Sequence, residues 1–241
     1  MLAVLSVEAR KLNRSLAALL AVAAPSLIAV FGFFMLLRST SAQPWDMWMN
    51  SAAGVWAFFM MPMSVTALTA LVAHMEHGPK SWDHLRALPL PRWKLYAAKA
   101  ICVLALLALM SAAVLAFSWA AVSLAGAIKP AVAATGPFDL AQYARVMAMM
   151  FGAGLLMVAI QLWIALRYAS FVPGLVVGIG GTFFAVVATA AKQGVFLPWQ
   201  MPVNMLATEA WRVNTALSLG GGLGLVALVL MTVHLARREV L

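Results

Sequence analysis

Long runs with almost no charged side chain are the feature that most constrains this chain. Six such runs occur, and a helix needs about 20 apolar residues to cross the hydrocarbon core of a bilayer. The chain is 65% hydrophobic and only 10% charged, whereas soluble domains carry about 25% charged residues. We therefore expect an all-α membrane protein, with residues 1–241 forming a single transmembrane domain. The expected spans are residues 15–37, 51–75, 99–126, 143–167, 170–191 and 213–236.

The distribution of basic residues predicts the orientation of these spans. Cytoplasmic loops carry an excess of Lys and Arg. If the N-terminus is inside, the inner segments hold Arg10, Lys11, Arg14, Lys80, Arg86, Arg92, Lys94, Lys99, Arg167, Arg237 and Arg238. The outer segments then hold only Arg38, Lys129, Arg145, Lys192 and Arg212. This bias predicts cytoplasmic N- and C-termini in a bacterial inner membrane. The net charge of +9 does not indicate nucleic-acid binding, because the charges lie between apolar runs.

Two segments outside the spans have an apolar pattern of their own. Before the first span, apolar residues recur at helical spacing, and we expect the charged residues to lie on the other faces. This pattern predicts a helix that lies at the membrane interface. A frayed tail is the alternative. The apolar residues are Leu2, Leu5, Ala9 and Leu12, and the charged ones are Glu8, Lys11 and Arg14. Between spans five and six, residues 193–208 are uncharged but too short to span and are interrupted by Pro198 and Pro202.

We expect residues 193–208 to form a short extracellular segment, resting at the outer interface or packed on the protein. Trp199 is expected to anchor this segment at the lipid headgroups. One hypothesis makes Pro198, Trp199, Met201 and Pro202 a lid over the exit of a transport pathway. The alternative is an interfacial anchor that never moves.

The one sizeable inner loop, residues 74–99, has a pattern suited to docking. Ser81 can cap a helix of about two turns that ends before Pro89. Trp82, Leu85 and Leu88 fall on one edge of that helix, and we expect no other part of the chain to cover this edge. The helix would then dock to a soluble partner or lie on lipid.

The same loop resembles the ABC-2-type ABC transporter permeases. The resemblance rests on Glu76 after the second span, then Gly78, Leu88-Pro89, Arg92 and a lysine opening the third span. In that family the loop contains the cytoplasmic coupling helix, which sits in a cleft of the ATPase subunit. The resemblance covers the whole chain. It implies an ATPase-coupling role for Glu76, Gly78, Trp82, Leu85, Leu88, Pro89, Arg92 and Lys99.

Two further stretches resemble the bacitracin and lantibiotic-immunity branch of these permeases. They are Ser170-Phe171-Val172 leading into residues 178–183, and residues 198–202. This resemblance implies antibiotic resistance by ATP-driven export of an amphiphilic, antimicrobial peptide-like or lipid-like substrate. Two permease subunits, identical or paralogous, would pair with two ATPase subunits in the membrane lipid. The alternative is a membrane component that binds or sequesters such a compound without pumping it.

The sequence argues against a catalytic role for the chain itself. It contains no Gly-Lys pair and hence no phosphate-binding P-loop, so we expect no cofactor here and place ATP and Mg on the partner ATPase. No span carries a charge near its middle, which argues against an ion-coupled carrier. We also expect no metal site, because Gly78-Pro79 separates His84 from His74, Glu76 and His77.

The spans contain weaker candidates for function. The GxxxG spacings of Gly174/Gly178 and Gly220/Gly224 predict close helix packing. Met-rich surfaces accept varied apolar partners, so we place Phe59, Met60, Met150 and Gln161 along a substrate pathway, with packing as the alternative role. Thr66, Gln161 and Thr182 are expected to hydrogen-bond between helices.

Overall fold

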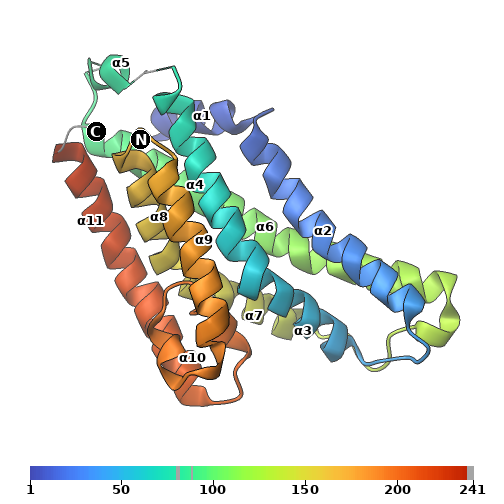
Figure 1. Ribbon diagram of the computed structural model, residues 1–241. Helices are drawn as coiled ribbons and strands as arrows, with labels where there is room; N and C mark the ends of the chain where they lie inside the picture. Colours follow the sequence, from blue (N-terminus) through green and yellow to red (C-terminus); the bar gives the residue numbers. More distant parts are fainter. Residues whose placement is uncertain (80–81, 88, 238–241) are drawn as a thin grey trace.

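The computed structural model describes residues 1–79, 82–87 and 89–237, and within these residues the secondary structure is helical apart from one isolated bridge between Pro44 and Thr135. Figure 1 shows the arrangement of the helices. The α-helices are α1 (Leu2–Leu12), α2 (Leu16–Arg38), α3 (Trp45–Val55), α4 (Met61–His77), α5 (Trp82–Ala87), α6 (Arg92–Ile128), α7 (Leu140–Ala153), α8 (Leu155–Arg167), α9 (Val172–Val187), α10 (Ala210–Leu217) and α11 (Gly224–Arg237).

Four of the described helices are long and apolar enough to cross a membrane. They are Leu16–Arg38, Trp45–His77, Arg92–Ile128 and Ala210–Arg237. The second of these contains the π-helical turn η1 (Trp56–Met60), which connects α3 to α4 as one continuous helix. The fourth contains the π-helical turn η6 (Ser218–Leu223), which connects α10 to α11 in the same way. Helices α7 and α8 make a fifth span if they are counted together, although they bend by 43°.

The prediction of six spans is not confirmed. The region expected to form the fifth span, residues 170–191, contains α9, which has only 16 residues. Beyond Val187 the chain continues as the short 3-10 turn η3 (Ala188–Ala190). Spanning helices usually need 17–25 residues, so the described residues support four or five spans by length and composition.

The helices form a bundle from which one pair diverges. Helix α11 packs on α8, and α4 packs on α8 and α9. Helix α2 packs along α6, and the two extend together away from α9 and α11 toward one side (Figure 1). One end of the bundle, here named the α5 end, is formed by α1, α5 and the end of α11. The opposite end contains α3 and α10.

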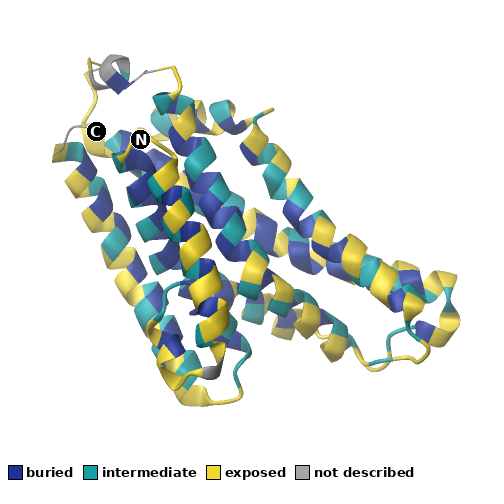
Figure 2. Cartoon of the chain, viewed as in Figure 1, coloured by how far each residue is buried: buried dark blue, intermediate teal, exposed yellow. Residues whose placement is uncertain are grey.

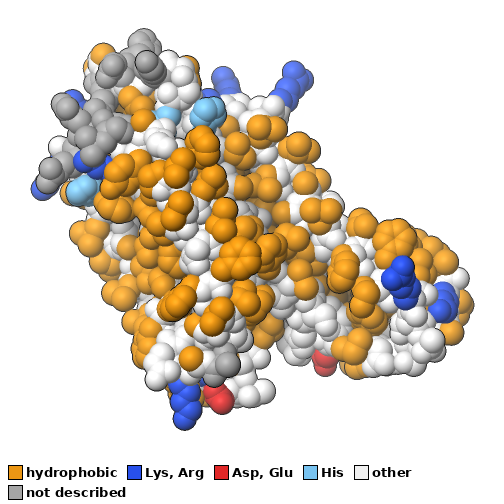
Figure 3. All heavy atoms as spheres, in the orientation of Figure 1, with side chains coloured by type: hydrophobic (Ala, Val, Ile, Leu, Met, Phe, Trp, Pro, Cys, Tyr) orange, Lys and Arg blue, Asp and Glu red, His pale blue; other side chains and the backbone are white. Residues whose placement is uncertain are grey.

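The pattern of burial is that of a protein surrounded by lipid. Fully buried side chains such as Trp56, Leu107 and Met157 fill the interior, whereas Phe31 and Leu230 are about 60% exposed. The exposed surface is apolar over most of the face shown in Figure 3, and Figure 2 shows buried and exposed faces on the same helices. A helix with apolar residues all round its axis belongs in a core or a membrane.

The N-terminal helix is present at the predicted place. Helix α1 ends at Leu12, and the chain turns at Arg14, which has a left-handed φ of 59°. Ser15 then begins α2, and its side chain accepts a hydrogen bond from the Ala18 backbone N–H at 3.4 Å. This tight turn directs α2 into the bundle while α1 stays across the end of α6, on which it packs.

Candidate functional site

Four charged side chains from three helices meet at the α5 end of the bundle. They are Glu8 and Lys11 of α1, Glu76 of α4 and Lys99 of α6, and we call them the charge cluster. The Lys99 Nζ atom lies 2.7 Å from Glu8 Oε2 and 2.8 Å from Glu76 Oε1. The Lys11 Nζ atom lies 2.9 Å from Glu8 Oε1 and 2.7 Å from Glu76 Oε1. Each lysine therefore contacts both carboxylates.

The charge cluster is largely withdrawn from water. The side chains of Lys99, Glu76 and Glu8 are only 1%, 3% and 7% exposed. Burying a single ion costs several kcal/mol, and pairing two lysines with two glutamates offsets that penalty. At Lys11, burial lowers the pKa, but hydrogen bonds to Glu76 and Glu8 outweigh it, so the pKa is raised above its ordinary value. Lys11 is therefore charged at neutral pH.

Trp82 of α5 packs against this cluster. Its indole Nε1–H donates to His77 Nδ1 at 3.0 Å, and its ring stacks on Tyr96 with centroids 5.6 Å apart. The Lys99 Nζ atom lies 5.9 Å from the centre of the Trp82 ring, a cation–π distance. Only 7% of Trp82 is exposed. The expectation that nothing in the chain covers this edge of the loop helix is therefore wrong for Trp82.

The rest of the loop is divided between buried and exposed residues. Helix α5 has six residues, which is close to the predicted two turns. The predicted cap Ser81 and the apolar Leu88 lie outside the described residues. Leu85 is partly buried against the main core. Gly78, Pro89 and Arg92 are exposed. The structure thus brings Glu76, Trp82 and Lys99 together and leaves Pro89 and Arg92 on the surface.

His77 connects this site to a helix deeper in the bundle. An indole N–H can only donate, so the His77 Nδ1 atom accepts from Trp82 and the proton belongs on Nε2. The Nε2–H then donates to the Ala165 carbonyl oxygen of α8 at 3.1 Å. This tautomer is assigned from its partners. A neutral His77 therefore joins α5 to α8.

Four residues of this site were not predicted from the sequence: Glu8, Lys11, His77 and Tyr96. A signal for Glu8 was present in the spacing of its neighbours. Leu5 precedes Glu8 by three residues and Leu12 follows it by four, and residues at these separations share a helix face. Glu8 therefore lies on the apolar face of α1, and the prediction that it lies on another face is wrong.

A second group of polar residues joins α8 to α9. Gln161 is fully buried. In the amide orientation that satisfies both neighbours, Gln161 donates to the Gly174 carbonyl oxygen at 3.2 Å and accepts from the Gly178 N–H at 2.8 Å. Gln161 thus bonds between helices, whereas Thr66 and Thr182 donate to backbone carbonyls of their own helices.

The four glycines predicted to mediate packing differ in their surroundings. A methyl group at Gly178 would overlap the Thr66 side chain, and one at Gly220 would overlap the Ala153 backbone. At Gly224 the methyl would come within 2.7 Å of Leu155 Cβ. Among the described residues, no atom lies within 4 Å of the corresponding position at Gly174. Close approach therefore requires glycine at three of the four positions.

The residues assigned to a substrate pathway lie in different environments. Phe59 and Met60 belong to the π-helical turn η1, where Phe59 is 41% exposed and Met60 is partly buried. Met150 and Gln161 are fully buried. A substrate could reach these two side chains only in another conformation of the bundle.

The segment 193–208 folds back onto the protein at the end opposite α5. It contains the 3-10 turns η4 (Lys192–Phe196) and η5 (Val203–Leu206). Trp199 and Met201 are 8% and 1% exposed, Pro202 is buried and Pro198 is partly buried. The Trp199 ring fills the space beside Gly181 of α9, where a methyl would lie 2.6 Å from the indole. The expectation that Trp199 anchors the segment among headgroups is therefore wrong.

A comparison with known families identifies the chain. Residues 4–189, well over half of its length, match the family model described as ABC-2 family transporter protein. The chain belongs to the ABC-2 transporter family. The match contains the whole charge cluster and α5, and it includes each helix from α2 to α9. No curated protein and no solved structure matches the chain significantly.

Membership defines the role of this ABC-2 protein in outline. It is the membrane component, or permease subunit, of an ABC transporter, and it works with a separate ATPase subunit. Among the described residues of the permease, no group of three His, Cys, Asp or Glu side chains is placed to hold a metal ion. The side chain of His84 lies outside that description.

Proposed function

We propose that this permease subunit drives export of an amphiphilic cargo and receives the ATPase movement through α5 and the charge cluster. The observation that carries the proposal is the position of Trp82. One side chain contacts His77 of α4 together with Tyr96 and Lys99 of α6. A force on α5 therefore reaches the ends of two long helices at once.

The contacts around Trp82 extend to the other helices of the bundle. From α6, the Lys99–Glu8 ion pair reaches the N-terminal helix α1. From α4, the His77 ring reaches the Ala165 carbonyl of α8. Helix α8 in turn holds α9 through Gln161. A partner that binds two arrangements of such a network with different affinities shifts the balance between them.

This network divides the predicted coupling residues between two roles. Pro89 and Arg92 are exposed beside α5 and are suited to touching the ATPase directly. Glu76, Trp82 and Lys99 are buried and are suited to transmitting movement within the permease. Leu85 is partly buried on the core side of α5 and can serve in either role.

The nature of the cargo follows from the membrane part of the permease. The described apolar helices bury polar groups such as Thr66, Gln161 and Thr182, and the described spans have no charged residue near their middle. An apolar interior favours an amphiphilic cargo, such as an antimicrobial peptide or a lipid-like antibiotic, over an ion. A second permease subunit, identical or paralogous, would complete the pathway. The excess of basic residues at the α5 end supports an orientation with this end in the cytoplasm of a bacterial inner membrane.

The proposal is tested by separating export from simple binding. A strain lacking this chain is exposed to a panel of membrane-active peptides and lipid-directed antibiotics. It is then complemented with the permease and either the active ATPase partner or a variant unable to hydrolyse ATP. Restored resistance with the active ATPase alone supports export. Full resistance with the inactive ATPase favours the alternative, in which the permease binds or sequesters the compound.

A further inference from the structure

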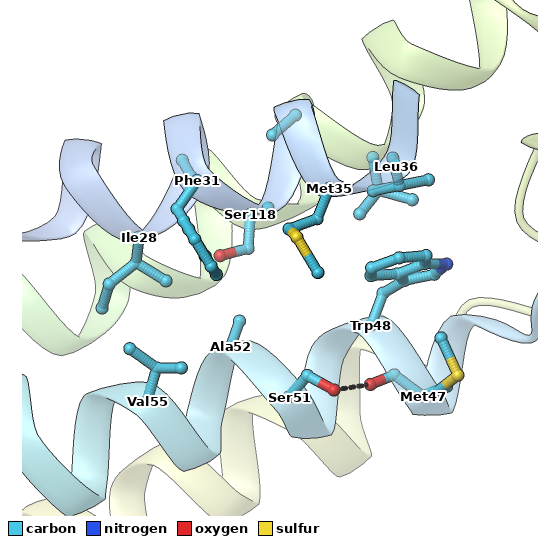
Figure 4. Close-up of a pocket in the computed structure, with 14 residues that line it drawn as sticks. Ile28, Phe31, Met35, Leu36, Met47, Trp48, Ser51, Ala52, Val55 and Ser118 are labelled. Atoms are coloured by element: carbon cyan, nitrogen blue, oxygen red, sulfur yellow. Dashed lines mark hydrogen bonds between the residues drawn. The ribbon is translucent and has the colours of Figure 1, made fainter. Parts of the chain in front are cut away.

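An apolar groove lies between α2, α3 and α6, toward the end of the bundle opposite α5. Its volume is about 290 Å³, close to the lower limit of about 300 Å³ for small-molecule sites. Figure 4 shows Ile28, Phe31 and Met35 of α2 facing Ala52 and Val55 of α3 across this space. The groove opens beside exposed apolar side chains, since Phe31 is 62% and Met35 is 48% exposed.

Two hydrogen-bond donors line this apolar groove without a partner. Ser118 of α6 is only 5% exposed, and its hydroxyl has no hydrogen-bond partner among the described residues. The buried Nε1–H of Trp48 likewise has no partner within the described chain. Buried donors are nearly always satisfied in proteins, so these two are exceptions. Both side chains line the groove in Figure 4, but the chain itself covers their polar atoms, so an occupant would contact the apolar parts of these two residues.

Basic residues lie at one end of the groove. Helix α2 ends at the exposed Arg38, directly after the groove residues Met35 and Leu36. The Lys129 Nζ atom donates to the backbone oxygens of Leu37 and Ser39 at 3.1 and 2.7 Å, so its ammonium is held at the same place. Figure 3 shows Lys and Arg side chains beside apolar surface at this end of α2 and α6.

Asp46 is the carboxylate next in sequence to a groove residue. Asp46, which precedes the groove residue Met47, accepts a hydrogen bond from the Tyr143 hydroxyl at 2.6 Å. The charge of Asp46 offsets one of the two cations, so Arg38 and Lys129 still leave this end of the groove with a net positive charge that favours an anion.

We propose that the groove binds an anionic phospholipid, with an acyl chain between α2, α3 and α6 and its phosphate beside Arg38 and Lys129. A lipid fits better than a free anion, because the groove itself is apolar. It fits better than a soluble ligand, because the exposed side chains beside the groove are apolar. This site is independent of the proposed export function, since a resident lipid needs no transport to bind.

The test uses a lipid probe and variants that fill the groove. The full-length permease with its ATPase is placed in phosphatidylcholine nanodiscs containing a trace of phosphatidylglycerol with a photoactivatable acyl chain. Cross-linked peptides are located by mass spectrometry. We expect labelling concentrated on α2, α3 and α6 and reduced about fivefold or more by Ser118→Phe. The control Val187→Phe adds the same side chain at a residue that is 77% exposed on α9 and should leave the labelling unchanged.

A second variant and a second probe make the outcome decisive. Ala52→Leu narrows the groove from α3 and should act like Ser118→Phe, and bound ATPase reports that both variants are folded. Arg38→Gln should lower labelling by phosphatidylglycerol about fivefold, because one cation near an anionic surface strengthens binding by about that factor. Labelling by a phosphatidylcholine probe should not change. The proposal is overturned if the amount of labelling on each helix depends only on how exposed its residues are. It is also overturned if neither Ser118→Phe nor Ala52→Leu reduces the labelling. Displacement by a peptide cargo but not by unlabelled phosphatidylglycerol also overturns it.

Discussion

Lys99 of α6 and Glu8 of α1 form a buried ion pair of 2.7 Å although they are 91 positions apart in the chain. This contact fixes the N-terminal helix to the helix that follows the inner loop. Glu76, at the end of α4, accepts from the same ammonium at 2.8 Å. Three chain segments therefore share one cation where the ATPase of an ABC transporter is expected to act.

Removing Lys99 should destabilise the permease strongly. Lys99→Met takes away one of the two cations that neutralise Glu8 and Glu76. Breaking a buried ion pair commonly costs about 3–5 kcal/mol, so thermal unfolding in detergent should shift to a markedly lower temperature. Lys94→Met, on the same helix but partly exposed, should shift it little. The double variant Glu8→Gln/Lys99→Met should recover part of the thermal stability that Lys99→Met loses. Equal effects of Lys99→Met and Lys94→Met would show that the charge cluster does not stabilise the permease.

Trp82→Ala should uncouple ATP hydrolysis from transport. The substitution removes the stacking on Tyr96 and the hydrogen bond to His77, and loss of a buried aromatic contact commonly costs about 2 kcal/mol or more. We expect ATPase association to persist while cargo-stimulated hydrolysis falls. Trp82→Phe retains a ring but not the N–H donor and should be intermediate.

Trp93→Ala is the matched control for Trp82→Ala. Trp93 stands at the start of α6 and is 48% exposed. Its truncation should change neither ATPase association nor stimulated hydrolysis. If Trp82→Ala and Trp93→Ala behave alike in reconstituted vesicles, Trp82 does not transmit the movement.

Gly178→Ala should disturb the packing of α9 on α4 and α8. The added methyl overlaps Thr66 and Gln161, and overpacking a core costs about 1–3 kcal/mol. Gly180→Ala, two positions along the same helix, meets no atom within 4 Å and should be neutral or slightly stabilising because alanine favours helix. Thermal unfolding of both variants measures the difference. A partial rescue of Gly178→Ala by Thr66→Ser or Thr66→Ala would locate the clash.

The sequence predicted the membrane class, the inner loop and a helix before the first span, because these depend on local periodicity and charge. The spacing from Leu5 and Leu12 puts Glu8 on the apolar face of α1, but the sequence did not predict its partner Lys99, which lies far away in the chain. The sequence also led us to expect that no other part of the chain covers Trp82 on the helix of the inner loop. Only the folded chain shows that His77 and Tyr96 lie within reach of that indole.

The number of spans and the role of some glycines were beyond sequence reasoning for a similar reason. An apolar run of suitable length was expected at 170–191, but α9 ends at Val187 and the chain leaves the α-helix there. The GxxxG spacing of Gly174 and Gly178 does not tell which side chains of the neighbouring helices come close to each glycine. Gln161 and Thr66 approach Gly178, while Gly174 retains free space.

Cysteine labelling tests the proposed orientation. In a Cys102→Ala background, an impermeant thiol reagent should label Gln193→Cys in intact spheroplasts and leave Arg92→Cys unlabelled until the membrane is opened. Both parent residues are exposed, so side-chain access does not bias the comparison. Labelling of Arg92→Cys in intact cells would reverse the orientation inferred from the distribution of basic residues.

Cross-linking tests whether the segment 193–208 is a lid. Trp199 is a poor position for a cysteine, because its ring is buried against Gly181. Phe196, on the turn η4, is 59% exposed and can face a second permease. If the segments of two permeases meet over the exit, Phe196→Cys on both should form a disulfide in the resting state. That bond should block efflux while ATPase association persists, and Trp199→Cys should not cross-link. Absence of the Phe196 cross-link, or a cross-link that leaves efflux intact, would make the segment a static cover of α9.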